Sequence, residues 1–413
     1  MAVVEEFPAD FITETDALRS APVWRSEPYI LLFPLGIVLG SAGVLHWMLH
    51  ALHLLPDYRP IFHAMTQIQG FMTSMATGFL FTMIPRRTGS APPAGWQIGI
   101  GLLAPLVTTI AAWERHWFIA QASWLILVIT IIGFAVRRFL SGQATRRPPN
   151  AFVWIPLALL MGVAGSIFAM GHGPLGASYP WLHSFGKGLV LQGMFIGFIL
   201  GVGSLALPLM TRGEAPADAG QTARDWLARA ANLVAAVLLV ASFWIEATSS
   251  MARGMLLRAI VIVVVLGLGA KLWRLPTRSA WHARLIWISA WMVPLGYLIA
   301  ALFPAQFKAG LHVTFITGFA LLSLMVSTQV TFAHDTQGDL MPGRSWQVGT
   351  IGSLVGLAAI ARVSMEFDPQ RRLMWMGIAA SMFLSATLMW AIFLVPKFLQ
   401  RIRHTRRAVI EPS

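Results

Sequence analysis

Cysteine is absent from the 413-residue chain, and charged residues are scarce. Without a thiol, the chain cannot hold a cysteine nucleophile, an iron–sulfur cluster, a cysteine zinc site or a covalently attached c-type heme. Charged residues make up only 11% of the chain, whereas a typical soluble domain has roughly 25%. So few charges cannot cover the surface of a soluble protein of this size, so much of the surface has to face lipid. These counts exclude a soluble enzyme, a disordered scaffold and a disulfide-stapled secreted module.

Long apolar runs follow one another along the whole chain, and a helix needs about 20 such residues to cross a bilayer. The longest break, near 210–225, is too short for a soluble domain. The first run is too long and begins too late to be a cleavable signal peptide. We therefore predict an all-α integral membrane protein with an amino-terminal segment (1–27), a transmembrane domain (28–395) and a basic tail (396–413). Its twelve predicted transmembrane helices are centred on 28–49, 61–84, 95–113, 116–136, 151–171, 181–207, 226–245, 254–273, 283–303, 309–332, 347–363 and 373–395.

Basic residues are distributed unevenly between the two sides of this predicted bundle. Of the 30 Lys and Arg residues, 21 fall on the side of both termini, 8 fall on the other side, and Lys187 lies just inside a helix. By the positive-inside rule, both termini are cytoplasmic. We expect the membrane to be the bacterial cytoplasmic (inner) membrane. The net charge of +13 then reflects orientation in the membrane, and we predict contact with membrane lipid and no nucleic-acid partner.

Most of the histidines fall at or near the outer face of the predicted bundle. Ionisable residues are costly inside a membrane and point to function by default, although those at the water interface, such as His53, His116 and His172, have an ordinary explanation. His46 and His50 are four residues apart, so they share one helical face. The eight outer histidines are His46, His50, His53, His63, His116, His172, His183 and His312.

Three of these histidines recur at regular intervals. His63, His183 and His312 each open a glycine-rich run, at intervals of 120 and 129 residues. Two of these runs end in similar polar segments, 85–89 and 208–213, and the third is followed by 334–338. The pattern predicts three pseudo-threefold-related four-helix units, each with one histidine directed toward a shared centre. The alternative is a coincidence among three loosely similar helices.

A stripe of glycines marks the predicted sixth helix, where Gly193, Gly197 and Gly201 are four residues apart and Gly186 precedes them. Such stripes allow helix backbones to approach closely. The other interpretation is a flat cofactor lying against the bare backbone.

Imidazoles from different helices are suited to bind heme iron, copper or zinc. A low-spin heme b needs two axial histidines, for which His63 and His312 are the candidates, although His183 could replace either one. A second heme, or a metal held by His183 with His46 or His50, would leave room for chemistry on a gas. A heme also needs cations near its propionates, and the candidates at that level are Arg59, Lys187 and Lys308.

Acidic residues are almost absent from the predicted spans, with Glu246 as the main exception. This argues against a proton- or sodium-coupled transporter, which usually needs buried carboxylates.

Three motifs resemble those of the NnrS family, which are twelve-span membrane proteins associated with heme, copper and resistance to nitric oxide stress. The first is Phe62-His63-Ala64-Met65-Thr66 with Gly70-Phe71, residues 78–82 and residues 85–89. The second is Leu182-His183 with Gly203, Pro208 and Thr211-Arg212. The third is Leu311-His312 with Gly318, Met325, Thr331, His334 and Thr336. The motifs occur in order along nearly the whole chain.

The chain also departs from the family pattern. Met65 and Thr66 stand where members have a second histidine and a glutamate. Ser204 and Gln329 stand where arginines are expected. The resemblance therefore implies a divergent relative that keeps its heme histidines, and the missing second histidine weakens the case for copper.

The order of the histidines is also similar to that of the heme–copper oxidase main subunit, where helices two and ten hold a low-spin heme. From all this we expect a heme b protein concerned with nitric oxide or electron transfer. It would be a heme-dependent oxidoreductase if it has an open site, with a quinol or a cytochrome as donor. One alternative is a non-catalytic subunit that anchors a larger respiratory complex or carries electrons within it. Another is a cofactor-free transporter.

Overall fold

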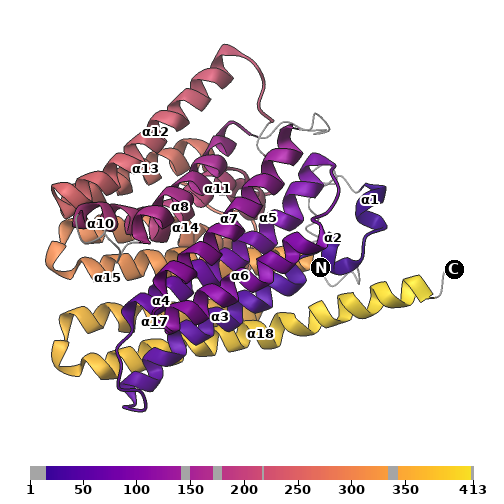
Figure 1. Ribbon diagram of the computed structural model, residues 1–413. Coiled ribbons are helices and arrows are strands. Elements are labelled where there is room, and N and C mark those ends of the chain that lie inside the picture. The colour runs from indigo at the N-terminus through magenta and orange to yellow at the C-terminus, as the bar shows by residue number, and fades with distance from the viewer. Residues whose placement is uncertain (1–14, 141–148, 171–178, 216–217, 334–342, 411–413) are drawn as a thin grey trace.

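The computed structural model describes residues 15–140, 149–170, 179–215, 218–333 and 343–410, and within those ranges the chain is helical without any strand (Figure 1). Two short helices, α1 (Asp16–Arg19) and α2 (Val23–Ser26), precede the bundle. The outer helices are α3 (Tyr29–Ala51), α6 (Gly95–Trp113), α7 (Trp117–Leu140), α8 (Trp154–Ala169), α12 (Ala223–Thr248), α13 (Met251–Ala270), α14 (Trp281–Leu302), α17 (Trp346–Phe367) and α18 (Arg372–Ile410). Short 3-10 turns lead into three helices: η3 (Asn150–Val153) into α8, η5 (Pro304–Gln306) into α15 and η7 (Pro369–Arg371) into α18.

The three histidine motifs lie on three composite helices, here called the inner helices. Each has a short α-helix, then a π-helical segment, then a second α-helix. A π turn holds one residue more than an α turn and is often found at functional sites. The inner helices are α4 (Pro60–Met65), η2 (Thr66–Met72) and α5 (Thr73–Thr88); α10 (Pro180–Gly188), η4 (Leu189–Gly193) and α11 (Met194–Arg212); and α15 (Phe307–His312), η6 (Val313–Ala320) and α16 (Leu321–Ala333).

Eleven helices among the described residues are long and apolar enough to cross a membrane. The segment predicted at 61–84 is not among them, although it is helical from Pro60 to Thr88. Its buried side chains are unusually polar, including Thr66, Gln67, Gln69, Thr73, Ser74, Thr77 and Thr82. A multi-pass helical membrane protein is therefore confirmed, whereas the count of twelve stays a prediction.

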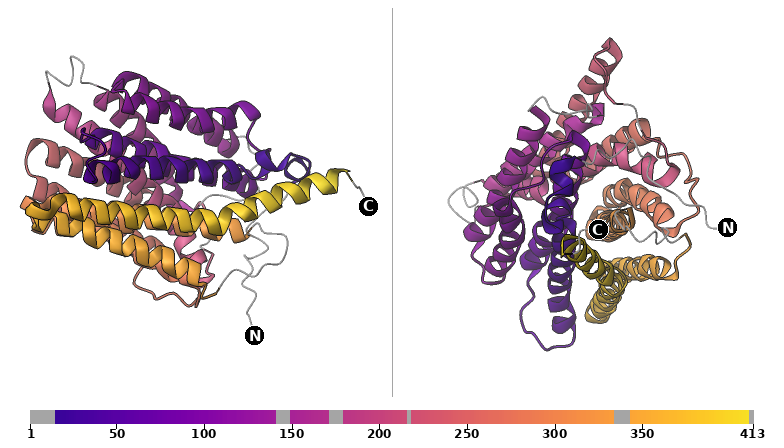
Figure 2. Two further views of the ribbon diagram at one scale, coloured as in Figure 1. Left: turned by 90° about the horizontal axis from the view of Figure 1, so that it is seen from below. Right: turned by 90° about the vertical axis from the view of Figure 1, so that its right-hand side faces the viewer.

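The packing of the helices repeats three times, in support of the predicted pseudo-threefold arrangement. The first inner helix packs against α3, α6 and α7, the second against α8, α12 and α13, and the third against α14, α17 and α18. Contacts between peripheral helices repeat from unit to unit: α7 with α8, α13 with α14, and α18 with α3. Contacts of α11 with α14 and of α16 with α5 also join neighbouring units. Figure 2 shows the bundle from the side and end-on.

Glycines bring the first and second helices of each unit together. A Cβ atom at Gly310 would lie 2.4 Å from the carbonyl oxygen of Gly296, and one at Gly165 would lie 2.5 Å from the backbone nitrogen of Val190. A Cβ atom at Gly197, in the glycine stripe, would lie 2.7 Å from the Cβ atom of Ala158 on α8. The stripe is therefore a helix-packing surface and not the wall of a cofactor site.

The polar segments predicted at the ends of the inner helices are helix caps in two of the three cases. Gly89 and Gly213 follow α5 and α11 with φ of 65° and 74°. Such left-handed residues stop a helix, and glycine adopts them without steric cost. The third segment, 334–338, lies outside the described residues, as does His172.

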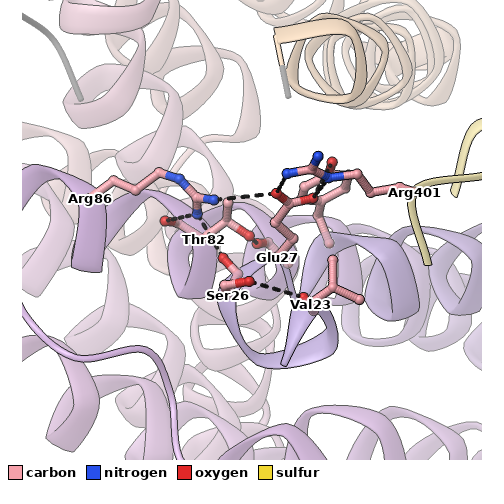
Figure 3. Close-up of polar contacts among 8 residues, drawn as sticks. Val23, Ser26, Glu27, Thr82, Arg86 and Arg401 are labelled. Atoms are coloured by element: carbon pink, nitrogen blue, oxygen red, sulfur yellow. Dashed lines mark hydrogen bonds and ion pairs between the residues drawn. The ribbon is translucent and has the colours of Figure 1, made fainter. Parts of the chain in front are cut away.

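A buried carboxylate ties the start of α3 to the ends of α5 and α18 (Figure 3). Glu27 is 2% exposed, and its Oε1 lies 2.6 Å from Nη2 of Arg401 and 3.7 Å from Nη2 of Arg86. The hydroxyl of Tyr29 donates to its Oε2 at 3.1 Å. The predicted basic tail from 396 thus begins inside α18, and its Arg401 belongs to the core of this end.

Neutralising this carboxylate should loosen that end of the bundle. Glu27→Gln removes the charge that faces two guanidinium groups, and we expect a loss of about 2 kcal/mol, the value of a hydrogen bond to a charged group. Thermal unfolding in detergent measures the loss. The exposed Glu114, changed to Gln, is the matched control. Equal melting temperatures for the two variants would contradict the role assigned to Glu27.

A second buried ion pair lies between helices of the second unit. Arg258 on α13 is fully buried, and its Nη2 lies 2.5 Å from Oε2 of Glu246 on α12. Its Nη1 donates to Oε1 of Gln192 in η4 at 2.9 Å, and the same oxygen accepts from the hydroxyl of Tyr297 on α14 at 3.0 Å. Arg258, which the sequence places among the basic residues of the outer face, instead connects the second unit to the third.

The carboxyl-terminal end of α18 and the short helix α1 lie at the same end of the bundle (Figures 1 and 2). The labels of α4, α10 and α15 lie at the opposite end (Figure 1). Reporter fusions after Ser413 and after Asp57 should therefore report opposite sides of the membrane, with the fusion after Ser413 cytoplasmic. Two fusions active on the same side would overturn this topology.

Candidate histidine site

The opening turns of the inner helices are built alike. Pro60 and Pro180 occupy the first turns of α4 and α10, where a proline has no amide hydrogen to lose and its fixed φ suits a helix. Pro304 opens the 3-10 turn that leads into α15. His63 and His183 follow their prolines by three residues and His312 follows Pro304 by eight, so the sequence places all three imidazoles near one end of the bundle.

Two histidines from neighbouring helices share one backbone carbonyl. The Nδ1 atoms of His46 on α3 and His63 on α4 lie 3.0 Å and 2.9 Å from the oxygen of Gly43. A carbonyl oxygen only accepts, so both Nδ1 atoms carry hydrogen and each Nε2 keeps its lone pair. A Cβ atom at Gly43 would lie 2.6 Å from Nε2 of Gln67, so glycine is what lets α3 approach this closely.

The same tautomer is set at two further histidines. Nδ1 of His312 lies 2.7 Å from the carbonyl oxygen of Lys308, and Nδ1 of His50 lies 3.0 Å from that of Leu55. Histidines that bind metals commonly donate their other ring nitrogen in this way, because the hydrogen bond fixes the ring and raises its basicity. Nε2 of His46 is buried without any hydrogen-bond partner.

His63 and His312 are half-buried and lie within electrostatic range of each other. Arg362 on α17 lies within electrostatic range of both. Its side chain is 13% exposed and pairs with Glu366 at 2.7 Å. We call His46, His63, His312 and Arg362 the histidine site.

Arg362 was missed as a site residue because it was counted with the outer loops. The signal that could have found it is its place in the apolar run 347–363, with Glu366 four residues later. Oppositely charged residues at that spacing face each other on a helix, and a buried arginine in a membrane helix calls for a functional explanation.

The other predicted cations are placed less favourably for an anionic ligand. Arg59 donates to the carbonyl oxygen of Trp113 at 2.7 Å, pairs with Asp57 at 3.0 Å and stacks over the Trp113 ring at 4.0 Å. Lys187 and Lys308 are exposed. Lys308 contributes to the site through its backbone carbonyl.

His183 is set apart from the other two recurring histidines. It lies six residues before η4 begins, whereas His63 lies three before η2 and His312 one before η6. Its helix α10 packs against α8 and α12. No described ring contact joins His183 to His46, His63 or His312, and its role as a ligand stays a prediction.

Aromatic rings surround the imidazoles of the first unit. The ring of Trp47 meets that of His63 at 5.1 Å and 90°, and the ring of Phe62 meets that of His46 at 5.1 Å. Tyr58 contacts Trp47 at 4.5 Å and His50 at 5.8 Å. These contacts hold the rings in an apolar setting that suits a neutral imidazole.

The chemistry of this arrangement is that of a ligand pair. Across the described parts of the chain, no three His, Asp or Glu side chains converge to hold one metal ion. Imidazoles from different helices with an arginine nearby are the kind of donor set that can bind heme iron or another metal ion.

Comparison with known proteins agrees with the motifs. The family model described as NnrS protein matches residues 23–401, from α2 into α18. Nearly the whole chain is covered, including every residue of the histidine site. No curated protein matches the chain.

Proposed function

Because the chain belongs to the NnrS family, we propose that it is a heme b-binding protein of the bacterial inner membrane that serves in nitric oxide metabolism or electron transfer. The observation that carries this proposal is the hydrogen bond from Nδ1 of each of His63 and His312 to a backbone carbonyl oxygen, at 2.9 Å and 2.7 Å. A neutral imidazole held in this way would have its Nε2 lone pair for iron. Bound heme would supply an iron centre that exchanges electrons.

Different residues of the histidine site would contact different parts of a bound heme. His63 and His312 are the axial candidates from the first and third units, and Arg362 is a cation within electrostatic range of both. His46 and the half-buried His50 lie nearby on α3, where they could assist a second metal. Copper is a lesser proposal because Met65 takes the place of a second histidine.

Reaction with a gas depends on an open coordination position. Two axial histidines would leave none, and the protein would then transfer electrons, with a quinol or a cytochrome as donor. Activity on nitric oxide would require His183 or His46 to hold a second heme or metal. Otherwise one axial histidine would have to dissociate from the iron.

An optical spectrum of the purified protein, oxidised and then reduced, tests the proposal. We expect a Soret band with the narrow visible bands of low-spin heme b. A shift of the reduced spectrum by carbon monoxide would support catalysis. Its absence would favour an anchoring or electron-wiring subunit of a respiratory complex. A colourless protein without iron would overturn heme binding and leave the cofactor-free transporter.

A further inference from the structure

A cavity of about 120 Å³ lies where the three inner helices meet. Its walls come from the first inner helix at Met75 and Phe79, from the second at Phe195 and Phe198, and from the third at Val326. We call it the central cavity. A side cavity of about 60 Å³ opens between the first and second units. The two cavities share the lining residues Phe79, Leu80, Val202, Ala206 and Met210.

Water is a poor occupant of these cavities because a buried water needs two to four polar partners. Ser323 and Ser327 are the hydroxyl residues of the central lining, and their hydroxyl groups donate to the carbonyl oxygens of Phe319 and Leu324. The side cavity has one charged lining residue, Arg87, and its guanidinium pairs with Asp218. Both cavities are therefore suited to an apolar occupant.

The volume and the apolar lining of the central cavity suit a small occupant. An engineered apolar cavity of about 150 Å³ stays dry and binds xenon or benzene, and the central cavity, which is open on one side, offers about 120 Å³. The occupant that fits is a small apolar molecule, such as a noble-gas atom or a diatomic gas.

A row of phenylalanine rings joins the central cavity to the histidine site. The His312 ring contacts Phe315 at 6.3 Å, Phe315 contacts Phe319 at 5.7 Å, and Phe319 contacts Phe195 at 6.2 Å. Phe195 lines the cavity. These rings are packed against one another, so a gas molecule could pass between the cavity and His312 only by displacing them through ring rotation.

We propose that the central cavity binds small apolar gas molecules taken up from the membrane, and that the phenylalanine row leads them to the histidine site. The delivery step rests on the proposed heme function, but the binding step does not. Lipid concentrates apolar gases, so a cavity inside the bundle is a physically reasonable store for a substrate such as nitric oxide.

Xenon tests the binding step in the full-length protein. The protein in phosphatidylcholine nanodiscs is examined by ¹²⁹Xe NMR saturation transfer, with empty nanodiscs as the blank. We expect saturable binding by the native protein, and none by Ala206→Phe, which fills the wall shared by both cavities. Ala231→Phe adds the same ring on the exposed face of α12 and should bind xenon normally. Ala206→Leu replaces Ala206→Phe if the latter fails to fold.

Lack of xenon binding by the native protein, or equal binding by the Ala206 and Ala231 variants, would overturn the cavity assignment. The delivery step is tested by the rate of nitric oxide binding to the reduced protein. We expect Ala206→Phe to slow it several-fold with an unchanged Soret band, and equal rates would refute the path. Protein without heme would defeat the proposed function while the xenon result still decides the cavity.

Discussion

Alanine at position 63 or 312 is expected to abolish the low-spin heme spectrum of the purified protein while the chain still accumulates in the membrane. Each substitution removes one Nε2 donor and leaves the opposite histidine in place. The iron would then be five-coordinate or lost altogether. Both histidines are half-buried and make a single backbone hydrogen bond through the ring, so neither change should disrupt the fold.

Heme content per protein and the reduced-minus-oxidised spectrum measure this effect. His116→Ala is the matched control, since His116 is an exposed histidine at the start of α7. Its spectrum should equal that of the native protein. His183→Ala separates the two pairings, because it changes the spectrum only if His183 is an axial ligand. Unchanged spectra for both His63→Ala and His312→Ala would remove the histidine site as the heme site.

Loss of Arg258 is expected to be the most destabilising single change in the bundle. Arg258→Met keeps much of the side-chain volume but leaves Glu246 and Gln192 without their buried partner. Breaking a buried ion pair from one side typically costs about 3–5 kcal/mol. Because whole domains are stable by only about 5–15 kcal/mol, we expect poor accumulation and a strongly lowered melting temperature.

The double variant Arg258→Met with Glu246→Leu provides the control. It removes both charges at once, and replacement of a whole buried pair by apolar residues is often neutral or stabilising. Thermal unfolding in detergent should therefore show the double variant to be more stable than Arg258→Met alone. A double variant that is no better than the single one would show that the ion pair is not the source of the loss.

The fold class could be predicted from the sequence because apolar length is a local property. Long apolar runs, interrupted by residues such as Pro148 and Pro149, are enough to locate membrane helices. The recurrence of His63, His183 and His312 likewise predicted three units, since each opens a similar run. The helix predicted at 61–84 is harder to recognise as a membrane span, because its threonines and glutamines face the protein interior and lower the mean hydropathy of the segment.

The side-chain contacts between different helices could not be predicted in the same way. Arg258 and Arg362 lie near the ends of apolar runs, where a loop residue and a buried residue look alike in sequence. Their neighbours on other helices, Gln192 and Tyr297 for Arg258 and His312 for Arg362, depend on how the helices rotate against each other. Arg59 stays a predicted cofactor cation; it lies within electrostatic range of His46, and its guanidinium also contacts Asp57 and Trp113.

In each inner helix, a π-helical segment separates the short α-helix that leads into it from the longer α-helix that follows. An α-helix turns by about 100° per residue, so loss of one residue from η2 would rotate His63 by that angle relative to Phe79. The imidazole would then leave Gly43 while the cavity wall stayed in place. The residues of η2 are buried themselves, and Met72 lines the central cavity. The length of the π-helical segment therefore sets how the histidine-bearing turn is rotated relative to the cavity wall of the same inner helix.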